Sequence, residues 1–119
     1  MNNFLNSKIY GLTAESLSKG KTNLQVVSEM IAAGIKVIQY REKEKSFKAM
    51  YEECLAIRKL TKEAQVTFII NDRLDLALAV DADGLHIGQD DLPITIARKL
   101  LGKDKILGLV KSRKKHTEV

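Results

Sequence analysis

Short apolar runs rich in β-branched residues alternate with amphipathic segments along this sequence. The runs cover residues 8–13, 35–40, 66–71, 84–87 and 105–109, and their length and composition predict strands. The stretches between them, residues 23–33, 46–64, 73–80 and 92–102, have the spacing and end residues of helices. Strands joined by such helices run parallel with right-handed crossovers. The sequence therefore predicts an α/β fold of five strands and four helices.

Two architectures fit this alternation. An open, flavodoxin-like sheet holds five strands in a chain of 119 residues. The first part of a (β/α)8 barrel has the same order of elements, although a complete barrel normally needs at least about 200 residues. In both architectures ligands bind beyond the carboxyl ends of the strands. The residues that directly follow the predicted strands are therefore the functional candidates.

Composition narrows the class of protein. An apolar content of 45% is enough for one hydrophobic core. A single cysteine allows no internal disulfide, so we expect a cytoplasmic protein, and no apolar run approaches the roughly 20 residues of a membrane span. Three of the five net positive charges lie in the last nine residues, without base-reading motifs. We expect one domain over residues 1–110, a basic disordered tail over 111–119, and no nucleic-acid or membrane partner.

Cationic and amide side chains follow the second predicted strand. Gln39 and Arg41 share one face because side chains alternate along a strand, and Lys43 follows where the chain leaves the sheet. Arginine binds phosphate with two parallel hydrogen bonds, lysine adds a point charge, and an amide both donates and accepts. In isolation such a segment is more often a solvated loop.

Acidic side chains follow the next two strands. Asn71 and Asp72 end the third strand, and Asp90 and Asp91 follow the fourth. Two carboxylates from neighbouring strand ends can hold one Mg²⁺ while substrate phosphates complete its coordination. Each motif alone is more typical of a turn or a helix cap. Their convergence on one rim with the cations predicts a metal–diphosphate site.

Two other reactive residue types receive a structural interpretation. His86 alternates with Leu85 and Ile87, so it faces the other side of the sheet, where a buried, hydrogen-bonded histidine is favoured over a general base. Cys54 lies on the apolar stripe of a helix and is expected in the core. No side-chain nucleophile paired with a base is evident.

The motifs resemble those of one family. The segments "QYREK" (39–43), "IINDRLDLALAVDADGLHIGQDDLP" (69–93) and "ARKLLGKDKILGL" (97–109) are closely similar to thiamine-phosphate synthases, and the resemblance spans about residues 8–109. It implies a (β/α)8 TIM barrel, of which this chain holds about the first five strands and four helices. It also implies a transferase that condenses hydroxymethylpyrimidine diphosphate with thiazole phosphate, giving thiamine phosphate and diphosphate.

The resemblance also implies roles for individual residues. Gln39, Arg41, Lys43 and Asn71 match the positions that bind the pyrimidine diphosphate in that family. The carboxylates that hold Mg²⁺ there match two residues of this chain, Asp72 and Asp91. The implied mechanism is dissociative: the diphosphate leaves, a pyrimidine-stabilised carbocation forms, and the thiazole nitrogen attacks it. Such a reaction needs positioning and electrostatic stabilisation and no protein nucleophile.

Two departures from the family pattern set further expectations. Val110 stands where the family has a substrate-binding serine, and Ser112 comes too late to replace it. The chain also stops after the fifth strand, before the segments that bind the thiazole phosphate. We therefore expect an incomplete, weakly active or inactive form, and a homo-oligomer that covers the exposed sheet edges.

Two alternative functions remain at this point. One is a non-catalytic fragment. The other is a phospho-receiver domain with a flavodoxin-like sheet, for which Lys111 lies where a receiver has its lysine. A receiver needs an acidic pair after its first strand, however, and this chain has Gly11-Leu12-Thr13 there.

Overall fold

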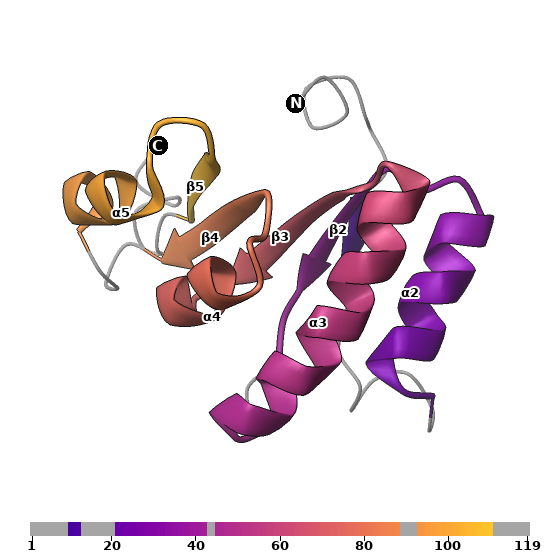
Figure 1. Cartoon of the computed structure of the whole chain (residues 1–119). Helices are drawn as coiled ribbons and strands as arrows, with labels where there is room; N and C mark the ends of the chain where they lie inside the picture. Colours follow the sequence, from indigo (N-terminus) through magenta and orange to yellow (C-terminus); the bar gives the residue numbers. More distant parts are fainter. Residues whose placement is uncertain (1–9, 13–20, 43–44, 89–92, 111–119) are drawn as a thin grey trace, which may run out of the picture.

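The computed structural model of the chain describes residues 10–12, 21–42, 45–88 and 93–110 (Figure 1). Five strands are present: β1 (Tyr10–Leu12), β2 (Val37–Tyr40), β3 (Thr67–Asn71), β4 (Gly84–Gly88) and β5 (Ile106–Val110). The helices within the described residues are four: α2 (Asn23–Ala32), α3 (Phe47–Ala64), α4 (Leu74–Ala79) and α5 (Ile94–Leu101). The predicted α/β alternation is confirmed in the described part of the chain. The predicted tail, residues 111–119, lies outside it.

The strand order decides between the two predicted architectures. The sheet runs β1-β2-β3-β4-β5, and every neighbouring pair is parallel. A flavodoxin-like sheet has the order 2-1-3-4-5 instead, because its chain reverses direction after the first crossover. Consecutive neighbours all the way across are the order of a (β/α)8 barrel. The flavodoxin-like architecture, and the phospho-receiver domain that would use it, are therefore wrong for this chain.

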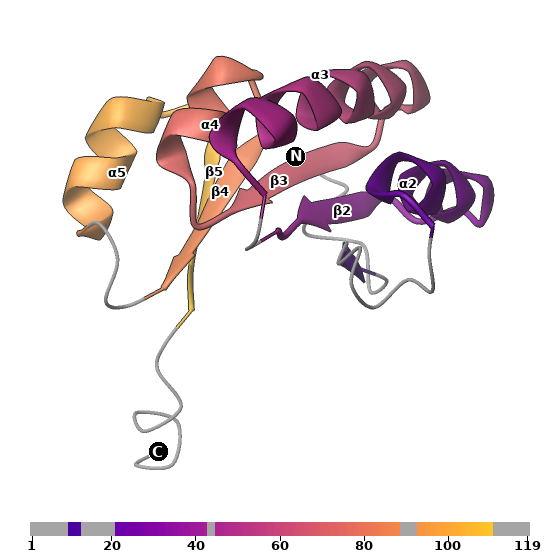
Figure 2. The same cartoon turned by 90° about the horizontal axis from the view of Figure 1, so that it is seen from below.

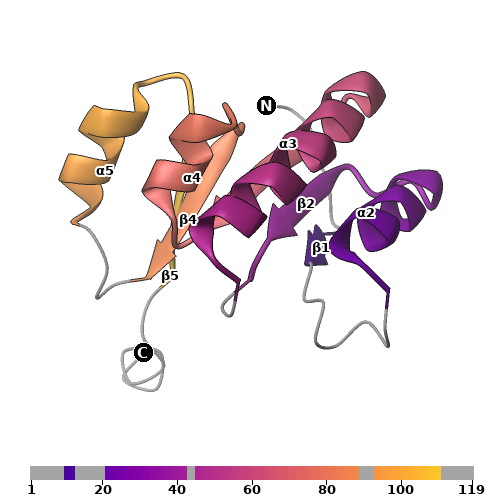
Figure 3. The same cartoon turned by 60° about the horizontal axis from the view of Figure 1, so that its bottom comes forward.

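The four described helices lie on one face of the sheet (Figures 2 and 3). Right-handed crossovers between successive neighbouring strands place every helix on the same side. Alternate strand residues point into the layer between sheet and helices, among them Tyr40, Phe68 and Leu85, each at most 1% exposed. The predicted apolar stripe of α3, including Met50 and Cys54, packs against them. The main core is therefore on the helix-covered face.

The opposite face of the sheet carries the other set of alternate residues. Across β2, β3 and β4, Gln39 is in register with Ile69, and Ile69 with Gly84. Two residues further along β3 and β4, on the same face, Asn71 is in register with His86. We call this the inner face, since in a closed barrel it would point toward the barrel axis. Polar side chains gather there toward the carboxyl ends of the strands.

Local sequence determines the helix ends. Thr22 and Gln25 form a reciprocal capping box at the start of α2, and the Ser46 side chain accepts the backbone N–H of Ala49 at the start of α3. Gly34 and Gly102 end α2 and α5 with φ of 90° and 94°, the region that favours glycine. Pro93, inside the range 92–102 predicted as helix, is the N-cap residue of α5.

None of the helices in the described segments is both long and apolar enough to cross a membrane.

Candidate functional site

The predicted site residues that the structure describes come from neighbouring strand ends. Gln39 lies near the end of β2 and is 3% exposed, whereas Arg41 follows the strand and is exposed. Asn71 is the last residue of β3, and Asp72 comes next; both are half-buried. β2, β3 and β4 are adjacent parallel strands, so their carboxyl ends form one rim. Lys43 and Asp91 lie outside the described residues.

Three side chains form a hydrogen-bonded line across this rim. The Nδ2 of Asn71 donates to Oε1 of Gln39 at 2.7 Å, and the Nε2 of Gln39 lies 2.9 Å from Nδ1 of His86. The line joins β3, β2 and β4, although Gln39 and His86 are 47 residues apart in sequence. Both amides are therefore held in place by neighbours on other strands.

His86 is the member of this line that the sequence interpretation undervalued. The structure confirms a hydrogen-bonded histidine that faces away from the core residues Leu85 and Ile87, and it is half-buried. That direction is also the direction of Gln39 and Asn71, so His86 belongs to the candidate site. The in-register pairing of Asn71 with His86 identifies it, but this pairing is known only once the strands are aligned.

Electrostatics link His86 to Asp72. Burial lowers the pKa of His86 below its ordinary value, and the nearby charge of Asp72 opposes that shift. The backbone N–H of Asp72 donates to the carbonyl oxygen of His86 at 2.8 Å, extending the pairing of β3 with β4 by one residue. Asp72 adopts a φ of 69°, an uncommon conformation for a residue other than glycine. The chain thus turns sharply where the carboxylate is presented.

The segment that follows β2 is anchored at both ends to one carboxylate. The Tyr40 hydroxyl donates to Oε1 of Glu53 at 2.6 Å, and the Lys45 ammonium lies 3.1 Å from each oxygen of Glu53. The fully buried Asn23 adds hydrogen bonds to Glu53 and to Glu42. Tyr40 and Lys45, which flank Arg41, therefore share one carboxylate partner on α3.

Arg73, although next to Asp72, is engaged elsewhere. Its guanidinium donates to both oxygens of Asp75, at 3.1 and 2.8 Å, and lies 5.3 Å from the centre of the Phe47 ring. These contacts fix it at the start of α4. Within the described residues no group of three or more His, Cys, Asp or Glu side chains is placed to hold a metal ion.

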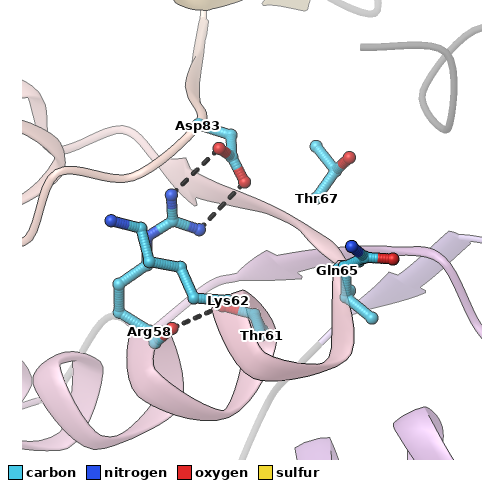
Figure 4. A pocket seen from close by; sticks show the side chains of 7 residues that line it. Arg58, Thr61, Lys62, Gln65, Thr67 and Asp83 are labelled. Atoms are coloured by element: carbon cyan, nitrogen blue, oxygen red, sulfur yellow. Dashed lines mark hydrogen bonds and ion pairs between the residues drawn. The ribbon is translucent and has the colours of Figure 1, made fainter.

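A pocket of about 280 Å³ lies elsewhere, near the end of α3 and the start of β3 (Figure 4). Its principal charged groups already neutralise each other, because Arg58 donates to both oxygens of Asp83. Strand starts in a parallel barrel mostly serve stability, whereas ligands bind at strand ends. We therefore assign this pocket no ligand. It is lined by Arg58, Thr61, Lys62, Gln65, Val66, Thr67 and Asp83.

Comparisons with known proteins point to one family. A family model described as "Thiamine monophosphate synthase" matches residues 9–118. A thiamine-phosphate synthase of Pelotomaculum thermopropionicum is 58% identical over 109 residues, covering 92% of this chain and 50% of that protein. Another from Caldicellulosiruptor saccharolyticus is 51% identical over 97% of this chain and 52% of the relative.

A solved structure shares the fold. Thiamine phosphate pyrophosphorylase from Pyrococcus furiosus superposes with a TM-score of 0.78 at 36% sequence identity, over 92% of this chain and 52% of that one. The chain spans about half the length of the curated relatives it matches. The similarity agrees with the consecutive parallel strand order, which is that of part of a (β/α)8 barrel.

Proposed function

The chain belongs to the thiamine monophosphate synthase family, and we propose that it supplies the pyrimidine-diphosphate half of a thiamine-phosphate synthase site. In this reaction hydroxymethylpyrimidine diphosphate is condensed with thiazole phosphate, giving thiamine phosphate and diphosphate. The chemistry is a group transfer in which the bond from the pyrimidine methylene carbon to the diphosphate oxygen breaks and a bond to the thiazole nitrogen forms.

The observation that carries the proposal is the hydrogen-bonded line from Asn71 through Gln39 to His86 at the strand ends. It joins two predicted substrate-binding residues, of which Asn71 directly precedes Asp72 and Gln39 lies two residues before the exposed Arg41. We assign Gln39 and Asn71 to the organic part of the pyrimidine diphosphate. We assign Arg41 and Lys43 to its phosphates, because cations bind phosphate oxygens with charge-assisted hydrogen bonds.

Asp72 and Asp91 are the residues that would hold Mg²⁺. The described one fits such an ion: Asp72 is a hard carboxylate donor at a strand end, and its charge reaches His86. Mg²⁺ commonly binds one or two carboxylates and takes its other ligands from water and substrate phosphates. When bound, the ion would supply positive charge to the departing diphosphate.

The residues of this chain contribute binding and positioning to the transfer. Arg41 and Lys43 stabilise the negative charge that accumulates on the leaving diphosphate. Gln39 and Asn71 hold the pyrimidine so that its reactive carbon faces the incoming thiazole. No protein atom forms a covalent bond with substrate in this scheme, in keeping with the prediction that no side chain acts as nucleophile or base.

A ligand-stabilisation experiment tests the proposal. Pyrimidine diphosphate with Mg²⁺ should raise the melting temperature of the chain, because a ligand that binds only the folded state stabilises it. Asp72→Ala and Asp91→Ala should each remove most of that shift. Asp104→Ala, at an exposed position between α5 and β5, is the matched control and should keep it. A wild-type chain that shows no shift at saturating ligand would refute the proposal.

Turnover is a separate question, because the chain spans about half of its relatives. We propose that thiazole phosphate binding needs segments that follow the fifth strand in the family. Product should therefore form when the chain carries or is mixed with the second half of a relative, and only weakly or not at all when it is assayed alone. Efficient turnover by the 119 residues alone would contradict this.

The cytoplasmic location, the absence of nucleic-acid and membrane partners, and a homo-oligomer that covers the sheet edges stay predictions. In the described sheet the two edges are β1 and β5.

A further inference from the structure

The His86 ring is confined from two sides on the inner face. Its Nδ1 lies 2.9 Å from the amide nitrogen of Gln39. Behind it, a Cβ atom added to Gly108 would come within 2.9 Å of Cδ2 of the ring, closer than such atoms approach in proteins. Gly108 and His86 are partners in the pairing of β4 with β5. The absence of a side chain at position 108 therefore allows the ring to occupy the place where it meets Gln39.

In each hydrogen bond of this line, the donor and the acceptor can be assigned. An amide nitrogen donates and does not accept, so Nδ1 of His86 must accept the hydrogen of Gln39. The same orientation turns the Gln39 oxygen toward Asn71, whose Nδ2 donates to it at 2.7 Å. A histidine that accepts at Nδ1 in its neutral form carries its proton on Nε2. Each end of the Gln39 amide is thus matched by a partner of the complementary type.

We propose that His86 is a positioning residue for substrate recognition, acting by fixing which way the Gln39 amide faces. The inference rests on the proposed function and adds a residue to it. His86 does not itself react in this scheme. Nδ1 of His86 binds the amide nitrogen of Gln39, and Asn71 binds the amide oxygen. Together they prevent a rotation of the amide that would exchange the positions of its oxygen and nitrogen.

The orientation of this amide matters because of the chemistry of the ligand. An aminopyrimidine presents an amino donor beside a ring nitrogen acceptor, and a glutamine amide pairs with such an edge in only one orientation. A turned amide would oppose donor to donor and acceptor to acceptor. The phosphates need no such orientation, since Arg41 and Lys43 bind them through charge. His86 should therefore influence binding of the organic part of the ligand and leave binding of inorganic diphosphate alone.

The tautomer of His86 is the first test, and it needs no ligand. Proton–nitrogen correlation NMR of the full chain at about pH 8, above the ordinary histidine pKa of about 6.5, should show the proton on Nε2. The spectrum of His86→Leu identifies the signals, because the chain has only one other histidine, His116. A proton on Nδ1 would mean that both amides face the other way, and would overturn the inference.

Matched variants form the second test. His86→Asn keeps an acceptor on the atom bonded to Cγ, where Nδ1 stands, whereas His86→Leu removes it. Calorimetric titration with Mg²⁺ and pyrimidine diphosphate should show roughly tenfold weaker binding for His86→Leu, the effect of one net hydrogen bond, and near wild-type binding for His86→Asn. Gly108→Ala should weaken binding in the same direction, because it displaces the ring without removing it.

Titration with Mg²⁺ and inorganic diphosphate is the internal control, and its affinity should be unchanged in all three variants. Equal weakening for both ligands would assign His86 a merely structural role and overturn the inference. Unchanged binding of pyrimidine diphosphate by His86→Leu would also overturn it. Failure of the wild-type chain to bind pyrimidine diphosphate at all would instead refute the proposed function, and the positioning role with it.

Discussion

Arg58 on α3 donates two hydrogen bonds to Asp83, at 2.9 and 3.0 Å, with the guanidinium and the carboxylate facing each other in parallel (Figure 4). One of the same carboxylate oxygens also accepts the backbone N–H of Phe68 at 2.8 Å. Asp83 therefore connects a helix, the start of β3 and the turn that leads into β4. It lies one residue before Gly84, so it helps to place the strand that carries His86.

Replacing Asp83 should lower stability strongly. In Asp83→Asn an amide group would face the guanidinium or the Phe68 N–H, which leaves a donor opposed to a donor. Removing one partner of a mostly buried, hydrogen-bonded pair costs about 2–4 kcal/mol in the free energy of unfolding. Urea denaturation followed by circular dichroism measures the change.

Asp81→Asn is the matched control for this substitution. Asp81 accepts a hydrogen bond from Lys105 at 2.7 Å, but its side chain is 67% exposed. Exposed pairs contribute about 0–1 kcal/mol, and asparagine tolerates the positive φ of 55° at this position. Equal losses in the two variants would show that Asp83 does not have the connecting role described above.

Tyr40→Phe should destabilise the chain by about 1–2 kcal/mol, because it removes a buried hydroxyl that donates to the carboxylate of Glu53. Burial and this hydrogen bond hold the pKa of Tyr40 above its ordinary value, so the hydroxyl keeps its proton and donates at neutral pH. Tyr51→Phe is the control, since the Tyr51 ring stacks on Phe47 and its hydroxyl makes no hydrogen bond with other described residues. The two melting temperatures should differ accordingly, and similar values would contradict the assignment.

Cys54 should react slowly with thiol reagents in the native chain. It is completely buried in the core, and burial raises the pKa of its thiol well above the usual range, so the reactive thiolate is absent. Labelling with iodoacetamide at pH 8 should accelerate by orders of magnitude once urea unfolds the chain. Rapid labelling without denaturant would show that the helix layer opens readily.

Ionised Asp75 should stabilise the folded chain, and this stabilisation should be lost at low pH. The hydrogen bonds from Arg73 hold the pKa of Asp75 below its ordinary value, and the Leu76 N–H adds to the effect. A depressed folded-state pKa stabilises the fold above the unfolded pKa of about 3.9, and the stabilisation is lost as pH falls through the folded value. Wild type should therefore be more stable than Asp75→Asn at pH 7, with the difference shrinking below about pH 4. A constant difference would exclude this ionic contribution.

Much of the fold could be predicted from local sequence. Alternation along β2, β3 and β4 separates the core residues from Gln39 and Asn71, and it correctly turns His86 away from Leu85 and Ile87. Gly34 and Gly102 mark helix ends because few other residues accept a positive φ. Such patterns involve only residues that are close together in the chain, so they can be read from the sequence without knowing the fold.

The sequence predicted individual residues of the candidate site but did not predict the contact between Gln39 and His86. The sequence interpretation gave Gln39 a role toward substrate and His86 only the role of a buried, hydrogen-bonded histidine. It had no way to join them, because side-chain contacts between strands depend on register, and register depends on packing across the whole sheet.

By itself, then, the sequence determined the succession of strands and helices and the face on which each strand residue lies, because both follow from short-range sterics and from burial. The family resemblance implied a barrel, but the alternation of elements left the strand order open, and only the tertiary structure showed the consecutive order and the contact of His86 with an amide 47 residues away. Both are long-range outcomes, set by which strands pair and in what register, and no local stretch of sequence contains them.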